Sequence, residues 1–205
     1  MNPRTQRLLV PGPAGSLQCA LDEPEGGQSV GMALLCHPHP QHGGTMDNKV
    51  VQTLARAFLQ LGWRTVRFNF RGVGESAGHW DRGIGEIDDA RAVLTACRKD
   101  GERLALGGFS FGASVATHVA QAFEGDPALA RLLLVGPAVV NFPPAPVSPA
   151  TGVVHGERDE VVPLAAVMDW ARPQGLPVMV LPGAGHFFHG QLAVLKQILL
   201  TLGRS

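Results

Sequence analysis

The sequence lacks the features that tie a protein to a membrane, to nucleic acid or to an oxidising compartment. No run of about 18 or more apolar residues could span a bilayer, and residues 1–7 lack the apolar core of a signal peptide. The net charge is zero and no basic run occurs, which argues against a nucleic-acid or membrane-surface partner. Cys19, Cys36 and Cys97 are an odd number at scattered positions, so we expect reduced thiols and a cytoplasmic protein.

Apolar strand-like runs alternate with helix-like runs along the chain. With 205 residues, of which 45% are hydrophobic, the chain is expected to form one domain over residues 1–205. The alternation predicts an α/β fold with a mostly parallel, doubly wound sheet flanked by helices. The expected strands are residues 32–36, 64–70, 103–107, 131–136, 152–155 and 177–181, and the expected helices are residues 48–61, 86–98, 113–123 and 189–202.

Two further local features are expected from the sequence. Residues 7–10 and 17–21 predict an N-terminal antiparallel hairpin, joined through a Gly-Pro-Ala-Gly turn at residues 12–15. Asp88 and Asp89 are expected in the first turn of the helix at 86–98, where the helix dipole favours carboxylates.

Residues 108–112 read Gly-Phe-Ser-Phe-Gly between a predicted strand and a predicted helix. G-x-S-x-G in this context is the pattern of a nucleophile elbow, with Ser110 at the apex of the turn. Glycine suits both flanking positions because it has no Cβ and tolerates unusual backbone angles. The alternative is a structural turn, since the chain has 26 glycines and the pattern can arise by chance. The flanking strand and helix favour Ser110 as the nucleophile.

An acid and a base follow Ser110 in the chain. Asp159 lies in a polar loop after the strand at 152–155, and His186 lies in a glycine-containing loop after the strand at 177–181. Serine, acid and histidine take this order in α/β-hydrolases. The carboxyl ends of parallel strands meet at one edge of a sheet, so we expect the three side chains to meet there. His189 competes with His186, but it lies at or near a helix start and cannot be aimed as freely.

The chain resembles the α/β-hydrolase superfamily over nearly its whole length, and more narrowly the small lidless bacterial hydrolases related to dienelactone hydrolase. The resemblance is carried by the elbow, by His-Gly-Glu-Arg-Asp at 155–159 and Gly-His-Phe-Phe at 185–188, and by residues 37–51 and 68–76. It implies an α/β-hydrolase fold, and its His-Gly-x-x-Asp pattern selects Asp159 over Glu157 and Glu160 as the acid. Dienelactone hydrolase has a cysteine nucleophile where this chain has Ser110, so its lactone substrate is not carried over.

Acyl transfer also needs fixed N–H groups for the oxyanion, each worth about 3 kcal/mol. The N–H of Phe111, the residue after the nucleophile, is expected to be one donor. The second is expected from the loop after residues 32–36, where Pro38 and Pro40 have no N–H. The superfamily's His-Gly-x pattern places His39 at this position, and it would act through its backbone.

The histidines of this loop also permit a different interpretation. His37, His39 and His42 could resemble metal ligands, but no cysteine or acidic partner lies at ligand spacing beside them. We therefore expect no metal and no cofactor. His42 could instead line the substrate mouth or be solvated.

The connection at residues 137–151 contains five prolines and is too short to fold into a helical lid. No cap domain is therefore expected, and the site should be open. The loop could form one wall of a shallow pocket through Phe142 and Val147. Further candidate pocket residues are Phe109, Phe187 and Phe188, although at least two of the phenylalanines near the site could simply belong to the core.

These features predict a serine hydrolase that cleaves small or short-chain carboxylic esters by two-step acyl transfer. The expected partner is a small-molecule ester or thioester. The same triad could serve a thioesterase, an amidase or peptidase, or an acyltransferase. A non-catalytic α/β-hydrolase scaffold used for binding is the alternative from another class.

Overall fold

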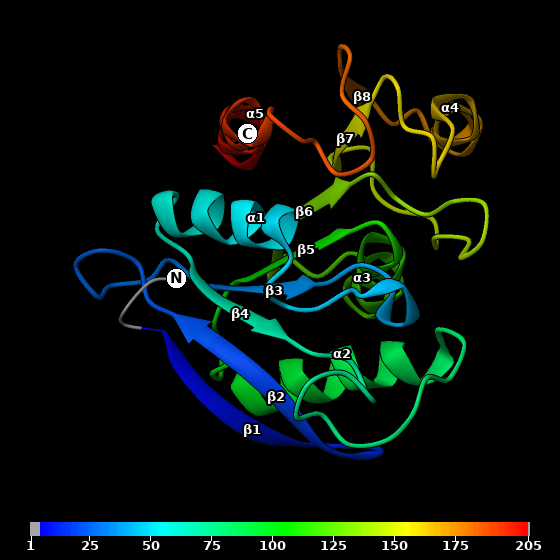
Figure 1. Ribbon diagram of the computed structural model, residues 1–205. Coiled ribbons are helices and arrows are strands. Elements are labelled where there is room, and N and C mark those ends of the chain that lie inside the picture. Colours follow the sequence, from blue (N-terminus) through cyan, green and yellow to red (C-terminus); the bar gives the residue numbers. More distant parts are fainter. Residues whose placement is uncertain (1–4, 205) are drawn as a thin grey trace.

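A computed structural model describes residues 5–204 as eight strands and five α-helices. The strands form one sheet in the order β1-β2-β4-β3-β5-β6-β7-β8 (Figure 1). They are β1 (Gln6–Gly12), β2 (Gly15–Asp22), β3 (Met32–Cys36), β4 (Arg64–Phe68), β5 (Leu104–Phe109), β6 (Leu129–Val135), β7 (Gly152–Gly156) and β8 (Val178–Leu181). The hairpin of β1 and β2 is antiparallel and β2 pairs antiparallel with β4, whereas every other pair is parallel. The predicted α/β-hydrolase sheet is confirmed.

Helices cover both faces of the sheet (Figure 1). On one face, α1 (Lys49–Gln60) and α5 (Leu192–Arg204) pack on an apolar core that includes Phe58 and Leu199. On the other face, α2 (Ile84–Cys97), α3 (Phe111–Ala120) and α4 (Leu164–Ala171) pack on a second core. None of the helices in residues 5–204 is long and apolar enough to cross a membrane.

The helix expected at 48–61 forms as α1, and a side-chain cap at Asn48 sets where it begins. The Asn48 side chain accepts hydrogen bonds from the N–H groups of Val50 and Val51, at 2.8 and 3.4 Å, and so caps the helix. Apolar residues at helical spacing, including Leu54 and Phe58, are buried against the sheet.

Helix α2 begins at Ile84, two residues before the predicted start. The Glu86 carboxylate accepts hydrogen bonds from the N–H groups of Asp81 and Gly83, at 2.9 and 2.8 Å, and these bonds set the start of the helix. The prediction that Asp88 and Asp89 lie in the first turn is therefore wrong. Asp89 is instead buried in an ion pair with Arg71.

The last helix begins at Leu192 rather than at His189. Turns occupy the preceding residues: the Phe188 N–H donates to the Gly185 carbonyl at 3.1 Å, and the Gln191 N–H donates to the Phe188 carbonyl at 2.9 Å. His189 is therefore exposed in a turn and does not begin a helix.

Residues 137–151, all of which the structure describes, form a connection without helix or strand. Two hydrogen bonds connect it to the elbow and to α3. The Ala138 N–H donates to the Ser110 carbonyl at 3.3 Å, and the Ala145 N–H donates to Thr117 Oγ1 at 2.9 Å. Residues 5–204 contain no cap domain, as predicted, and the carboxyl edge of the sheet is left uncovered by a lid.

Candidate active site

Ser110 lies in a strained turn between β5 and α3. Its φ of 54° and ψ of −119° are unusual for a serine, because the left-handed region favours glycine. A Cβ on Gly108 would lie 2.2 Å from the Gly112 carbonyl oxygen, and a Cβ on Gly112 would lie 2.3 Å from the Cys36 carbonyl oxygen. Only glycine fits at either position, because Gly108 lies directly against the first turn of α3 and Gly112 lies directly against the end of β3. The local geometry is that of a nucleophile elbow.

The structure brings Ser110, His186 and Asp159 into one hydrogen-bonded line. His186 Nε2 lies 3.0 Å from Ser110 Oγ, and His186 Nδ1 lies 2.7 Å from Asp159 Oδ2. The three residues come from the ends of β5, β7 and β8, which meet at the carboxyl edge of the sheet, and all three are buried. This arrangement can activate a hydroxyl group as a nucleophile.

The competing acids and base lie elsewhere. Glu157 accepts a hydrogen bond from the Gly183 N–H at 2.7 Å, and Glu160 is exposed. The His189 ring packs at 5.8 Å from the Phe187 ring and is also exposed. None of the three makes a hydrogen bond to Ser110 or His186 among the described residues.

The Asp159 carboxylate is held ionised by its surroundings. Burial raises the pKa of this carboxyl, but hydrogen bonds from His186 and from the Val162 N–H lower it by more, so the net pKa lies below its ordinary value. Asp159 Oδ1 also accepts from the Val161 N–H at 2.9 Å. An ionised Oδ2 can only accept, so His186 Nδ1 carries a proton and Nε2 is free to accept the Ser110 hydroxyl proton.

His155 is a buried neighbour of this acid that our sequence reasoning did not assign to the site. Its Nε2 donates to the Val162 carbonyl at 2.9 Å and lies 3.5 Å from Asp159 Oδ2. Burial lowers the pKa of His155, so the ring is neutral. It braces the loop whose N–H groups hold the Asp159 carboxylate. His155 is the first residue of the His-Gly-x-x-Asp pattern at 155–159, and this pattern is the sequence signal by which it could have been found.

The loop after β3 is fixed by His37. Its Nδ1–H donates to the Pro38 carbonyl at 2.6 Å, and its Nε2 accepts from the Phe70 N–H at 3.1 Å. Burial lowers the pKa of His37 to about 4, so the imidazole is neutral and both ring nitrogens are used. Among residues 5–204, no group of three His, Cys, Asp or Glu side chains is arranged to hold a metal ion.

His39 and Phe111 are the expected oxyanion donors, and their backbone surroundings are as follows. The His39 carbonyl accepts from the N–H groups of His42 and Gly44, at 3.1 and 3.0 Å, which rigidifies the loop. Within the described part of the chain, the N–H groups of His39 and Phe111 make no intramolecular hydrogen bond. Both N–H groups are therefore without an intramolecular partner, and the oxyanion role stays a prediction.

The phenylalanines near the site divide between the core and the surface. Phe109 and Phe188 are completely buried, so neither offers surface to a substrate, and their prediction as pocket residues is corrected. Phe109 packs beneath the His186 ring at 4.9 Å, and Phe188 belongs to the core under α5. The Phe187 ring is 45% exposed and lies 5.1 Å from the His186 ring, so it can contact a bound molecule.

Four rings form an aromatic cluster beside the elbow: His39, Trp80, Phe111 and Phe142. Ring centroids lie 4.5 Å apart for His39 and Trp80, 5.1 Å for His39 and Phe142, and 4.8 Å for Phe111 and Phe142. His42, which is exposed, stacks on His39 at 4.4 Å. Our sequence reasoning missed Trp80, because nothing in the loop after β4 shows that it folds over the elbow.

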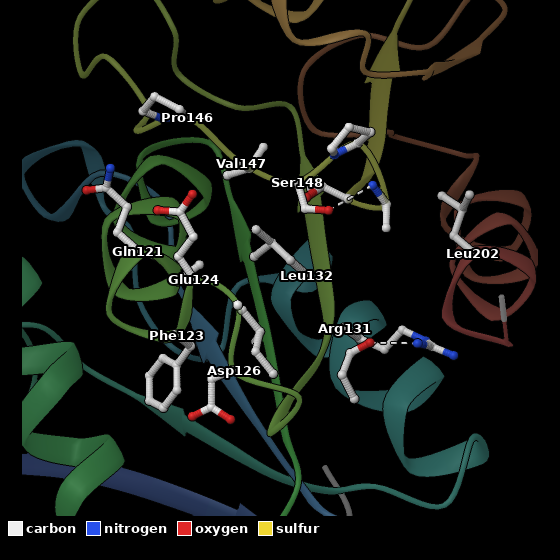
Figure 2. A pocket seen from close by; sticks show the side chains of 17 residues that line it. Gln121, Phe123, Glu124, Asp126, Arg131, Leu132, Pro146, Val147, Ser148 and Leu202 are labelled. Carbon is white, nitrogen blue, oxygen red and sulfur yellow. Dashed lines mark hydrogen bonds between the residues drawn. The ribbon is translucent and has the colours of Figure 1, made fainter.

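A separate cavity of about 770 Å³ lies at the amino end of β6. Figure 2 shows Phe123, Leu132 and Val147 among the side chains that line it, together with Leu202 of α5. No triad residue lines this cavity, so it is distinct from the site at the carboxyl edge.

The family described as "Serine aminopeptidase, S33" matches residues 39–180. An α/β serine hydrolase homologue from Coxiella burnetii is 39% identical, with 96% of each chain covered and a TM-score of 0.83. An α/β serine hydrolase without lid from Xanthomonas campestris is 38% identical, with 100% of this chain and 95% of that chain covered and a TM-score of 0.84. An uncharacterized protein of Rickettsia prowazekii is 33% identical over 174 residues, which cover 77% of this chain and 71% of the relative.

Proposed function

The chain belongs to the serine aminopeptidase S33 family of α/β-hydrolases, and on that basis we propose that it hydrolyses carboxylic esters of small or short-chain acids. The observation that carries the proposal is the hydrogen-bonded line from Ser110 Oγ through His186 to Asp159. An open edge without a lid favours small substrates in water over substrates that must be extracted from a lipid interface.

In the first half of the reaction, Ser110 Oγ attacks the ester carbonyl carbon while His186 Nε2 takes the hydroxyl proton. The new Oγ–C bond places negative charge on the former carbonyl oxygen, which accepts hydrogen bonds from the His39 and Phe111 N–H groups. The bond to the leaving oxygen then breaks, and His186 gives its proton to the departing alcohol. Asp159 stabilises the imidazolium throughout.

In the second half, a water molecule attacks the acyl-enzyme carbonyl carbon and gives its proton to His186 Nε2. The oxyanion forms again at the same two N–H groups. Collapse breaks the Oγ–C bond, returns the proton to Ser110 and releases the carboxylic acid. Thioesters and amides would follow the same route, and an acceptor other than water would make the protein an acyltransferase. Esters are proposed ahead of amides because an amine is a poorer leaving group than an alcohol and depends more on protonation as it departs.

The test is the intact mass of the protein after incubation with a fluorophosphonate, for the wild type and for Ser110→Ala. We expect one adduct on the wild type and none on the variant. A panel of short acyl esters, thioesters and anilides then ranks the leaving groups. A folded wild-type protein that forms no adduct would contradict an activated Ser110 and favour a binding scaffold.

A further inference from the structure

Two groups of rings flank Ser110 and share no ring contact with each other. On the side of the base, the Phe187 ring is 45% exposed and contacts the His186 ring at 5.1 Å, whereas Phe109, the other ring in contact with His186, is fully buried. On the other side lies the aromatic cluster, which includes the rings of both expected oxyanion donors. A substrate bound to Ser110 therefore has two different apolar surfaces available to it.

The chemistry of ester cleavage assigns one substituent to each surface. The leaving oxygen must accept a proton from His186 Nε2, so the alcohol part lies on the side of His186 and Phe187. The oxyanion lies at the N–H groups of His39 and Phe111. The remaining substituent of the carbonyl carbon, the acyl group, is directed away from His186 and toward the aromatic cluster.

We propose that the aromatic cluster is the acyl-binding surface and that it selects planar aromatic acyl groups, with Trp80 and Phe142 as specificity-determining residues. The inference rests on the proposed ester hydrolysis and adds the class of acid. Trp80, Phe142 and His39 are each partly exposed, so their rings can contact an acyl group, while Phe111 is buried beneath them.

The cluster is a rigid surface with ring edges and faces already in place. The Trp80 ring meets Phe111 and Phe142 edge-to-face, at 5.2 and 5.9 Å. A Cβ on Gly83 would lie 3.4 Å from the Phe111 ring and 3.6 Å from the Phe142 ring, so the backbone also packs closely against the cluster. A further ring gains edge-to-face or offset contacts that a saturated group of the same size lacks, worth about 0.5–1.5 kcal/mol or about two- to tenfold in kcat/KM.

The experiment compares p-nitrophenyl phenylacetate with p-nitrophenyl cyclohexylacetate, which share a leaving group and differ in planarity. We expect the wild type to prefer the phenylacetyl ester, and Trp80→Ala and Phe142→Ala to lower that ratio of kcat/KM values by about two- to tenfold. Trp80→Phe should keep most of the preference, because a ring remains. Trp63→Ala is the matched control: Trp63 packs against Phe58 in the opposite core and should leave the ratio unchanged although it destabilises the fold.

The inference is overturned if Trp80→Ala lowers kcat/KM equally for both esters, because the ring would then only hold the loops. It is also overturned if the ratio rises, since the ring would then obstruct the acyl group. Fluorophosphonate labelling separates this failure from that of the proposed function. If the wild type is labelled and the variants keep the wild-type ratio, only the acyl-binding surface is contradicted. If the wild type is not labelled, both proposals are contradicted.

Discussion

At the scale of single residues, backbone hydrogen bonds hold Ser110 and Asp159 before any substrate arrives. The Ser110 N–H donates to the Val135 carbonyl at 2.9 Å, and the Ser110 carbonyl accepts from the Ala113 N–H at 3.0 Å. These bonds maintain a backbone conformation that a serine rarely adopts. The Asp159 carboxylate is held in the same way by the Val162 N–H at 2.8 Å. Both side chains therefore meet His186 from fixed positions, which is the preorganisation that acyl transfer requires.

Replacing the acid tests this chain of contacts. Asp159→Asn keeps the shape but lets an amide face His186 Nδ1, which favours the wrong imidazole tautomer. We expect kcat for p-nitrophenyl acetate to fall about 10³- to 10⁴-fold with the fold intact by circular dichroism. Glu160→Gln removes a neighbouring exposed carboxylate and should change kcat by less than about twofold. An Asp159→Asn protein that keeps a tenth or more of the wild-type kcat would contradict the role of Asp159.

At the scale of elements, the elbow depends on how closely α3 approaches β3. The backbone of Gly112, the residue after Phe111, packs against the Cys36 and His37 carbonyl oxygens. The β3 loop carries the second expected donor, His39. The two proposed donors therefore lie in the two segments that meet at this contact, the start of α3 and the loop after β3.

A methyl group at this contact should disrupt both stability and catalysis. In Gly112→Ala the new Cβ would lie 2.3 and 2.4 Å from two backbone oxygens, so α3 must move away from β3. We expect the free energy of unfolding to fall by about 3 kcal/mol, measured by urea denaturation, and fluorophosphonate labelling of the remaining folded protein to slow at least tenfold.

Gly185→Ala is the matched control on the other side of the site. Its Cβ would meet only the Arg158 carbonyl oxygen, at an ordinary 3.7 Å. Its free energy of unfolding should stay within about 1 kcal/mol of the wild type. Equal stability of the two alanine variants would show that the contact at Gly112 is not tight.

At the scale of the whole molecule, one mostly parallel sheet between two apolar layers buries titratable groups as well as apolar side chains. His37 and His155 are both fully buried at the end of strands that carry the site. Burial lowers the pKa of each, because a charged imidazole would lose its hydration there. The stability of the fold is therefore linked to the same neutral histidines that brace the loops of the site.

This linkage predicts how stability depends on pH. The pKa of His37 falls from 6.5 to about 4 in the folded protein, so between these values the unfolded chain binds a proton that the native protein does not. The free energy of unfolding should thus decrease as the pH falls from 6.5 to 4, by about 3 kcal/mol from this group, and should not depend on it above 6.5.

Urea denaturation at pH 7, 5.5 and 4.5 measures this dependence. The His37→Gln variant has no titrating side chain at position 37. Between pH 7 and 4.5 its free energy of unfolding should decrease by about 2–3 kcal/mol less than the decrease in the wild type. His79→Gln, at an exposed histidine, should retain the wild-type dependence. The same loss in His37→Gln as in the wild type would contradict the neutral buried state of His37.

The alternation of strands and helices, the elbow at Ser110 and the chain order of Asp159 and His186 could all be predicted from the sequence. These features are local or follow from the order of the strands. A tight turn needs glycine at fixed offsets, a buried strand needs a short apolar run, and parallel strands bring their carboxyl ends to one edge whatever packs around them. The predicted sheet and hairpin are confirmed for this reason.

Which side chains surround that edge depends on tertiary packing and could not be predicted from the sequence. Phe109 and Phe188 are in the core while Phe187 is exposed, and Asp89 meets Arg71 instead of helping to start α2. The aromatic cluster joins four segments that are distant in the sequence. Burial and ring contacts depend on which segments pack against one another. A local sequence pattern does not specify packing partners that lie tens of residues away.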